Sequence, residues 1–165
     1  MNEIRYTPIG VIHTPFNEQK GTPIQPFAAR GAKGTVEVYD GFVEGLADIE
    51  GFSHIILLYH CHLSKPWRAK VVPYMDDKPR GVFSTRAPSR PNPIGLSVVR
   101  LIKVALPILH VQDVDILNGT PLLDIKPYVP DMDHRAVERL GWLEEKVQKL
   151  PKMMADRRFA SGDDG

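Results

Sequence analysis

The sequence predicts a mainly β fold, a single small β-barrel followed by a C-terminal helix. Short apolar or alternating segments of strand length recur along residues 1–130 and are separated by turn residues. The chain has 165 residues, and its 15 prolines and 13 glycines favour strands joined by turns over long helices. A chain of this length suits one compact domain. We therefore assign residues 1–130 to the barrel and residues 131–165 to a helix and a flexible tail.

The first part of the chain is expected to supply three strands and one long loop. Residues 4–13 indicate a bent or edge strand, because a proline and a glycine interrupt it. Residues 14–33 are rich in Pro and Gly and show no hydrophobic period, so they predict a long loop of a kind that is often functional. Residues 34–39 (GTVEVY) alternate and predict a strand. Residues 52–63 (FSHIILLYHCHL) form the strongest apolar run, which predicts a strand buried on both faces.

Later segments predict further short strands and one tight turn. These strands are expected at residues 69–74, 81–86, 94–105, 108–114 and 120–128. Asn118-Gly119 precedes the last of them and is the favoured dipeptide of a tight hairpin, because both positions tolerate positive φ.

After Pro130 the spacing of the apolar residues changes from that of strands to that of a helix. Asp133 is a suitable N-cap, and Pro151 would stop the helix. Apolar residues recur there at steps of three and four, which places them on one helix face: Val137, Leu140, Leu143, Val147 and Leu150.

Composition narrows the cellular setting and the class of ligand. No apolar run is long enough to cross a bilayer, and the N-terminus lacks the pattern of a secretory signal, so a cytoplasmic protein with no membrane partner is expected. Cys61 is the single cysteine, which rules out an intrachain disulfide. The net charge of +1 is unevenly distributed, because residues 65–103 carry +7. This basic segment indicates either a surface for an anionic ligand or solvated strand faces.

Residues 86–95 (RAPSRPNPIG) form the most distinctive motif. Pro91 and Pro93 fix φ and stiffen the loop, so little entropy is lost when a ligand binds. The loop displays Arg86 and Arg90, whose planar cations suit phosphate, carboxylate or nucleobase edges. The alternative is a structural proline corner whose arginines face water.

Other polar residues suggest chemistry but leave alternatives open. Asp115 and Asp124 flank the expected hairpin, and either is a candidate base or ribose acceptor, although aspartate beside a turn often bonds nearby amides. Strand alternation puts His54, His60 and His62 on one face, where a metal site is conceivable, but no further ligand is evident and a hydrogen-bonded pocket histidine is favoured.

Trp67 is a candidate for contact with a nucleic acid, because it stands beside the cations Arg68 and Lys70. It would either stack on a nucleobase or pack at a strand boundary. Fingerprints of nucleoside triphosphatases, Rossmann enzymes, serine esterases and zinc proteases are absent from the sequence.

Several of these segments, taken in order, resemble the TsaA-like, or TrmO, family. The similar segments are IGVIHTP (9–15), GFSH (51–54), GVFSTR (81–86), RPNPIG (90–95), NGTP (118–121) and DIKPY (124–128). The resemblance implies a β-barrel that works as a homodimer and binds S-adenosylmethionine without a Rossmann fold. It further implies methylation of the exocyclic nitrogen of threonylcarbamoyladenosine next to the tRNA anticodon.

The resemblance also implies a set of site residues. The cofactor would contact Pro23, Ile24, Gln25, His62, Leu63, Arg86, Leu96, Asp115, Ile116, Leu117 and Asn118. Ile24, Phe27 and Leu63 depart from the family's usual basic, glycine and polar residues. On this reading Asp115 or Asp124 serves as the base, Arg86 orients a carboxylate, and Arg68, Lys70 and Arg90 hold RNA phosphates. The alternatives are the same pocket acting on a small molecule or a protein, or a noncatalytic barrel that binds RNA or senses S-adenosylmethionine.

Overall fold

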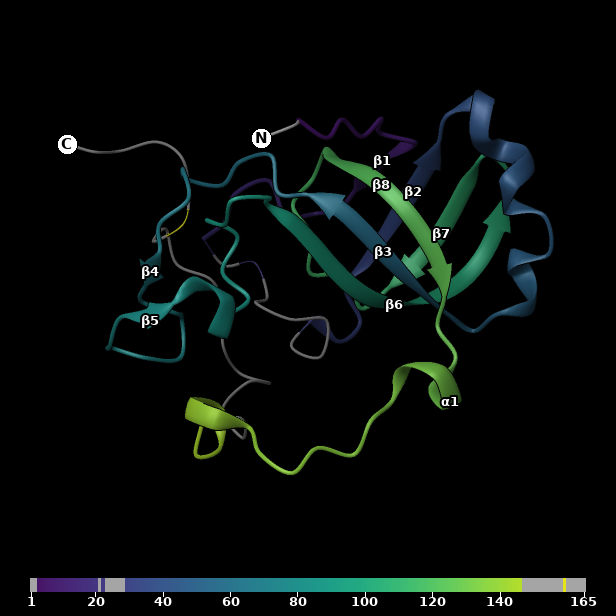
Figure 1. Ribbon diagram of the computed structural model, residues 1–165. Coiled ribbons are helices and arrows are strands. Elements are labelled where there is room, and N and C mark those ends of the chain that lie inside the picture. Colours follow the sequence, from purple (N-terminus) through teal and green to yellow (C-terminus); the bar gives the residue numbers. More distant parts are fainter. Residues whose placement is uncertain (1–2, 21, 23–28, 147–158, 160–165) are drawn as a thin grey trace.

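Six antiparallel strands close into a barrel, which confirms the predicted fold class (Figure 1). The computed structural model describes residues 3–20, 22, 29–146 and 159. The barrel strands are β1 (Gly10–His13), β2 (Lys33–Val38), β3 (His54–His60), β6 (Ile94–Ala105), β7 (Ile108–Gln112) and β8 (Thr120–Pro127). Around the barrel they follow the order β1-β2-β7-β6-β3-β8. The 3-10 turns η2 (Asp40–Leu46) and η3 (Ile49–Gly51) connect β2 to β3.

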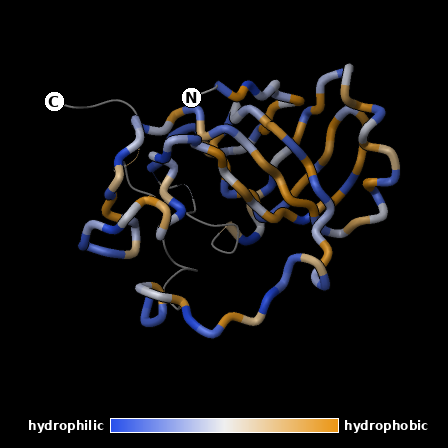
Figure 2. Tube along the Cα trace, viewed as in Figure 1, coloured by the Kyte–Doolittle hydropathy of each residue, from blue (hydrophilic) through white to orange (hydrophobic). Residues whose placement is uncertain are grey.

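Strand alternation fills the barrel interior with branched apolar side chains. Figure 2 shows hydrophobic residues recurring along the barrel strands. The fully enclosed residues include Ile12, Val36, Ile55, Leu57, Val99, Leu109 and Leu122. The prediction that the strand over residues 52–63 is buried on both faces is wrong. Ile55 and Leu57 are enclosed while Ile56 and Leu58 are only half-buried, because a closed barrel buries one face of each strand.

The connections between strands correct the predicted hairpin. β6 and β7 pair directly with each other. Asn118-Gly119 does not close a hairpin, since β8 pairs with β1 and β3 rather than with β7. Gly119 does adopt a positive φ of 76°. The backbone N–H of Asn118 donates to the Phe16 carbonyl at 2.7 Å, so this turn is tied to the loop after β1.

A small second unit lies beside the barrel. It consists of β4 (Lys70–Val71) paired with β5 (Arg80–Gly81), followed by the 3-10 turn η4 (Val82–Ser84). The strand predicted over residues 69–74 is confirmed at Lys70–Val71. The strand predicted over residues 81–86 is wrong beyond Gly81, because residues 82–84 form a 3-10 turn. The unit has its own apolar cluster, separate from the barrel core and made of Val71, Val82, Ala87 and Phe159 with Tyr74 packed against it.

The predicted C-terminal helix is wrong for the part of it that the structure describes. Helix α1 spans only Pro130–Asp133, so Asp133 ends a helix instead of capping one, and residues 134–146 contain only the 3-10 turn η5 (Gly141–Leu143). Val137 is 66% exposed and Leu140 is 42% exposed, so this part of the expected apolar face is not covered by the described residues. Such a helix is marginal without packing. In Figure 1 the segment instead runs from α1 toward β4 and β5. Val147, Leu150 and Pro151 lie outside the described residues.

Candidate functional site

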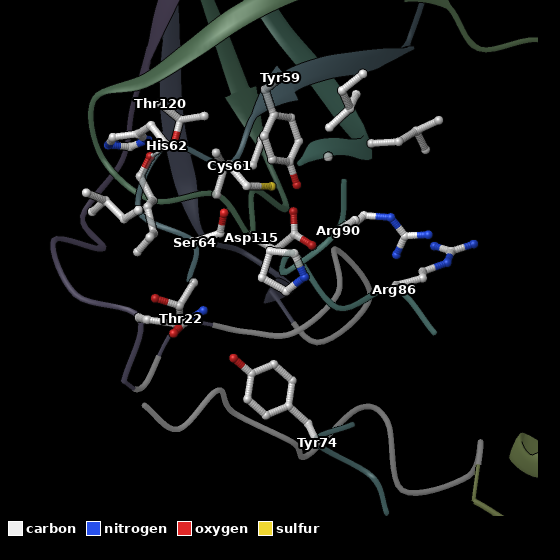
Figure 3. A pocket seen from close by; sticks show the side chains of 18 of the residues that line it. Thr22, Tyr59, Cys61, His62, Ser64, Tyr74, Arg86, Arg90, Asp115 and Thr120 are labelled. Atoms are coloured by element: carbon white, nitrogen blue, oxygen red, sulfur yellow. Dashed lines mark hydrogen bonds between the residues drawn. The ribbon is translucent and has the colours of Figure 1, made fainter. Parts of the chain in front are cut away.

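A cavity of about 400 Å³ lies where the barrel meets the small unit (Figure 3). Its walls come from the end of β3, the start of β6, the segment before β8 and the loop after η4. Its volume falls within the range of small-molecule sites, about 300 to 1,000 Å³. Segments distant in the sequence therefore converge on one ligand-sized space.

A chain of three hydroxyl and carboxyl groups runs along the barrel side of the cavity. The Ser97 hydroxyl donates to Asp115 Oδ1 at 2.6 Å, and the Tyr59 hydroxyl lies 3.0 Å from Ser97 Oγ. Because a serine hydroxyl has one proton and Asp115 accepts it, the Tyr59 hydroxyl is the donor to Ser97. The chain Tyr59–Ser97–Asp115 therefore holds the carboxylate in one orientation.

Gly95 makes room for the first member of this chain. It lies directly opposite Tyr59 in the β3–β6 register. A Cβ added at Gly95 would lie 2.1 Å from Tyr59 Cε2, which is far inside contact distance. Glycine at the end of the RPNPIG motif is thus required by the tyrosine ring beside it.

Burial determines the protonation states of the side chains in and around the Tyr59–Ser97–Asp115 hydrogen-bond chain. Removal from water raises the pKa of the Asp115 carboxyl to about 6, while the Ser97 hydrogen bond and the positive charge of Arg86 oppose that rise. Asp115 is therefore mostly ionised at neutral pH yet close to its titration point. Burial, followed by the nearby Asp115 charge, also raises the pKa of Tyr59 and brings the pKa of the Cys61 thiol to about 11. Both hydrogens stay in place at neutral pH, so Cys61 is no nucleophile.

The three histidines that were considered for a metal site do not act together. His62 lines the cavity, where burial and then His60 lower its pKa, and its Nδ1 lies 3.5 Å from Thr120 Oγ1. His54 lies 2.9 Å from Ser53 Oγ and packs edge-on against Tyr128. Among the described residues, no group of three His, Cys, Asp or Glu side chains is placed to hold a metal ion.

The arginine loop after η4 forms the opposite wall. Arg90 is half-buried, and its Nη1 donates to the carbonyls of Thr85 and Ala87 at 3.0 and 3.1 Å. Its guanidinium also lies 5.9 Å from the centre of the Phe83 ring. Arg90 therefore fastens the loop on itself, and both Arg90 and the more exposed Arg86 line the cavity. Figure 3 shows both arginines on one side of the cavity.

The structure brings together most of the residues expected at a cofactor site. Those in the cavity wall are His62, Leu63, Arg86, Leu96, Asp115, Ile116 and Leu117. Pro23, Ile24 and Gln25 lie outside the described residues, as does Phe27.

The remaining expected residues lie away from the cavity wall. Asn118 is not part of the wall, and its side chain bonds the Thr14 amide and Asn17 instead. Asp124 also lies elsewhere, on β8, paired with Lys126 at 2.8 Å. Arg68 and Lys70 are exposed on the small unit.

Sequence reasoning missed several residues of the wall. Tyr59 is one of them, and Ser97, which is bonded to Tyr59 but is not itself in the wall, was missed as well. Each interrupts an apolar run within its strand, and that departure from the pattern was the available signal. Gln19 carried no signal, because it belongs to a loop without a period. Gln19 lines the cavity, and its Oε1 is buried without a hydrogen-bond partner among the described residues.

Comparisons with known proteins agree on one family. The model of the tRNA-methyltransferase O N-terminal domain matches residues 11–134. A Pyrococcus abyssi protein named as a probable S-adenosyl-L-methionine-binding protein is 60% identical over 158 residues, which are 96% of this chain and 86% of that protein. The tRNA (adenine(37)-N6)-methyltransferase of Escherichia coli is 36% identical over 140 residues. The matched region is 79% of this chain and 60% of that protein.

A solved structure shows the same likeness in three dimensions. The crystal structure of TrmO from Pseudomonas aeruginosa aligns with a TM-score of 0.71 at 40% identity, over 86% of this chain. This chain spans 63% of that protein's chain, so it is the shorter of the two.

Proposed function

Since the chain belongs to the family of the tRNA-methyltransferase O N-terminal domain, we propose that it is an S-adenosylmethionine-dependent methyltransferase acting on tRNA. The proposed acceptor is the exocyclic nitrogen of threonylcarbamoyladenosine next to the anticodon. The observation that carries the proposal is the ionisable Asp115, fixed by Ser97 within a ligand-sized cavity that Arg86 also lines. A tRNA substrate supports a cytoplasmic location, which we include in the proposal.

The residues in the cavity wall suit S-adenosylmethionine. The ligand has a carboxylate, which Arg86 would hold by paired charge-assisted hydrogen bonds. It also has N–H donors on its ammonium group and its adenine ring, for which the unpaired Gln19 Oε1 is an acceptor. Apolar wall residues that would contact the adenosine are Leu63, Leu96 and Ile116. When bound, the cofactor supplies an electrophilic methyl group on a sulfonium.

Asp115 is the proposed proton acceptor of the transfer. The acceptor nitrogen is part of a urea-like group and is a weak nucleophile until it loses its proton. Its N–H would donate to the Asp115 carboxylate. Asp115 would take the proton that this nitrogen loses as it accepts the methyl group, and the sulfonium would thereby become a thioether. Ser97 and Tyr59 keep the carboxylate aimed, so that little reorganisation is needed. Asp124 has no such position.

Basic residues outside the cavity are proposed to hold the RNA. Arg68 and Lys70 are exposed on the small unit, at the start of the segment that carries +7. Phosphate contacts of this kind position a nucleic acid and make its affinity depend on salt. Arg90 would contribute indirectly, because its guanidinium already bonds two carbonyls of its own loop.

The working form is proposed to be a homodimer. The cavity rim carries the exposed apolar side chains of Leu63, Ile94 and Leu96, which are 43%, 42% and 51% exposed. A second copy of the chain packed against this rim would cover it and narrow the opening. Sedimentation analysis should then give twice the 18.5 kDa chain mass. A sedimenting species of one chain mass contradicts the homodimer.

The direct test is methyl transfer from labelled S-adenosylmethionine to tRNA. Two substrates are compared, tRNA with and tRNA without the threonylcarbamoyl group, and the product nucleoside is identified by mass spectrometry. We expect label only in the modified tRNA, full activity in the control Asp124→Asn and a loss of cofactor binding in Arg86→Ala.

The same assay separates the competing functions. Label in a protein or a small molecule instead of tRNA supports a different acceptor for the same pocket. Cofactor binding without transfer to any acceptor supports a noncatalytic binding protein. Either result overturns the proposed activity.

A further inference from the structure

The segment after α1 docks on the small unit instead of the barrel. We call residues 141–146, together with Phe159, the C-terminal strap. Trp142 Nε1 donates to the Ser84 carbonyl at 2.8 Å. The Trp142 ring also faces two cations, with Arg80 Cζ at 5.6 Å and Lys146 Nζ at 5.8 Å from its centre. The strap therefore contacts the turn η4 through both a hydrogen bond and an aromatic face.

A buried carboxylate joins the strap to the small unit. The Asp76 side chain is 1% exposed and pairs with Arg80 at 2.8 Å and with Lys146 at 2.5 Å. The hydrogen bond from Lys146, followed by that from Arg80, holds the pKa of Asp76 well below its usual range. One of the two compensating cations thus comes from the strap. Without it, the enclosed carboxylate would keep only Arg80 as its ion-pair partner.

The third contact of the strap reaches a residue of the cavity wall. Phe159 is 4% exposed and packs edge-on against Tyr74, with ring centres 5.0 Å apart. The Phe159 carbonyl also accepts the backbone N–H of Lys65 at 3.1 Å, next to the wall residue Ser64. Two parts of the wall are therefore held from behind by one strap residue.

The hydrogen bond from Trp142 to the Ser84 carbonyl lies two residues from Arg86. Ser84, the acceptor for Trp142, is followed by Thr85, whose carbonyl Arg90 binds, and then by Arg86. Among the described residues, the cluster of the small unit has four buried apolar side chains, and Phe159 is one of them. A unit with so small a core has little rigidity of its own. The placement of Arg86 therefore depends on what fastens η4.

We propose that the C-terminal strap positions the Arg86 wall of the cavity, with Trp142 and Lys146 as positioning residues that touch no substrate. The inference rests on the proposed cofactor site and goes beyond it, because the family model ends at residue 134, before the strap begins. Its consequence is specific. Loosening the strap weakens cofactor binding, while the Tyr59–Ser97–Asp115 chain on the barrel continues to work.

The test compares variants that remove the strap contacts in steps. Trp142→Phe keeps the ring but loses the hydrogen bond to Ser84, and Trp142→Ala loses both. Lys146→Met removes the cation from Asp76, and Lys146→Arg restores it. Trp67→Phe is the matched control, because it changes the other tryptophan, which is 56% exposed.

Two readouts separate positioning from general damage. We expect Trp142→Ala and Lys146→Met to raise both the Kd and the KM for S-adenosylmethionine about five- to tenfold, the effect of losing one or two hydrogen bonds, with kcat within about twofold of wild type. Trp142→Phe should give a smaller rise, Lys146→Arg should match wild type, and Trp67→Phe should keep the wild-type Kd for S-adenosylmethionine. If Trp142→Ala fails to fold, Trp142→Phe and Lys146→Met still test the proposal.

Failure of this proposal is distinct from failure of the proposed function. A wild-type protein that binds no S-adenosylmethionine contradicts the cofactor site itself. Wild-type binding together with unchanged Kd in the strap variants contradicts only the strap. A fall in kcat equal to the rise in KM, or no rescue by Lys146→Arg, also overturns the positioning role.

Discussion

Replacing Asp115 with asparagine should remove activity and stabilise the protein at the same time. The amide keeps an oxygen that can accept the Ser97 hydroxyl but carries no charge and accepts no proton. Transfer to tRNA should therefore fall by about 100-fold or more, in line with the loss of a general base. A gain in stability is expected because the charge that does the chemistry is costly to bury.

The size of the gain follows from the pKa of this one group. Its pKa rises from 3.8 to about 6 on folding, and each unit corresponds to about 1.4 kcal/mol. Ionising Asp115 in the folded state therefore costs on the order of 3 kcal/mol. Between the two pKa values the folded state binds more protons than the unfolded state, so this cost appears as pH rises from about 4 to about 6 and is complete above that.

The comparison of wild type with Asp115→Asn should therefore depend on pH. The variant should match wild type in unfolding free energy near pH 4 and exceed it by about 3 kcal/mol near pH 8, a shift of roughly 6–12 °C in Tm for a chain of this size. Urea unfolding at both pH values measures the difference. Asp124→Asn is the matched control, because the Asp124 side chain is 43% exposed and should give no such gain.

Two outcomes would refute this reasoning about Asp115. Wild-type turnover in Asp115→Asn would remove it as the proton acceptor. An equal stability difference at pH 4 and pH 8 would show that burial of the charge is not its cause.

Three further predictions concern the same site. Gly95→Ala should displace the Tyr59 ring and lower kcat about tenfold or more, whereas Gly81→Ala, whose added Cβ meets nothing within 4 Å, should keep wild-type kcat. The kcat for methyl transfer should rise with pH through about 6 as Asp115 ionises, and a flat profile over pH 5–7 counts against that role. The affinity for tRNA should fall steeply with salt, and Arg68→Ala or Lys70→Ala should each reduce the slope of log K against log salt by about 0.7 to 0.9; unchanged slopes would place the RNA elsewhere.

Features encoded in short stretches of sequence could be predicted. The strands of the barrel were visible because alternation over five to ten residues is a local property. The arginine loop was visible because two prolines and two arginines share one short motif. The sequence left two interpretations of this loop, a ligand-binding loop and a structural corner, and the contacts support both. Arg90 bonds a carbonyl of its own loop, and Arg86 lines the cavity.

Features that depend on distant contacts could not be predicted. Asp115 and Asp124 look alike in the sequence. In the fold, Asp115 lies between β7 and β8 and bonds Ser97, whereas Asp124 lies on β8 and pairs with Lys126 at the surface. The C-terminal spacing of apolar residues predicts a helix only if a surface covers that face. Trp142 and Lys146 instead find partners about 60 to 70 residues earlier in the chain, which no local period reveals.

The two sides of the cavity face different physical demands. The proton acceptor must be held within a few tenths of an ångström and kept partly desolvated, which a closed barrel achieves through an interior packed with residues such as Ile55 and Leu57. The arginine wall must meet charged ligands and therefore remains exposed, so it cannot be stiffened by a large core. Its rigidity has to come from Arg90 within the loop and from the strap behind it. On this view the catalytic chemistry belongs to the barrel, whereas affinity for the cofactor is adjustable through a segment that makes no contact with it.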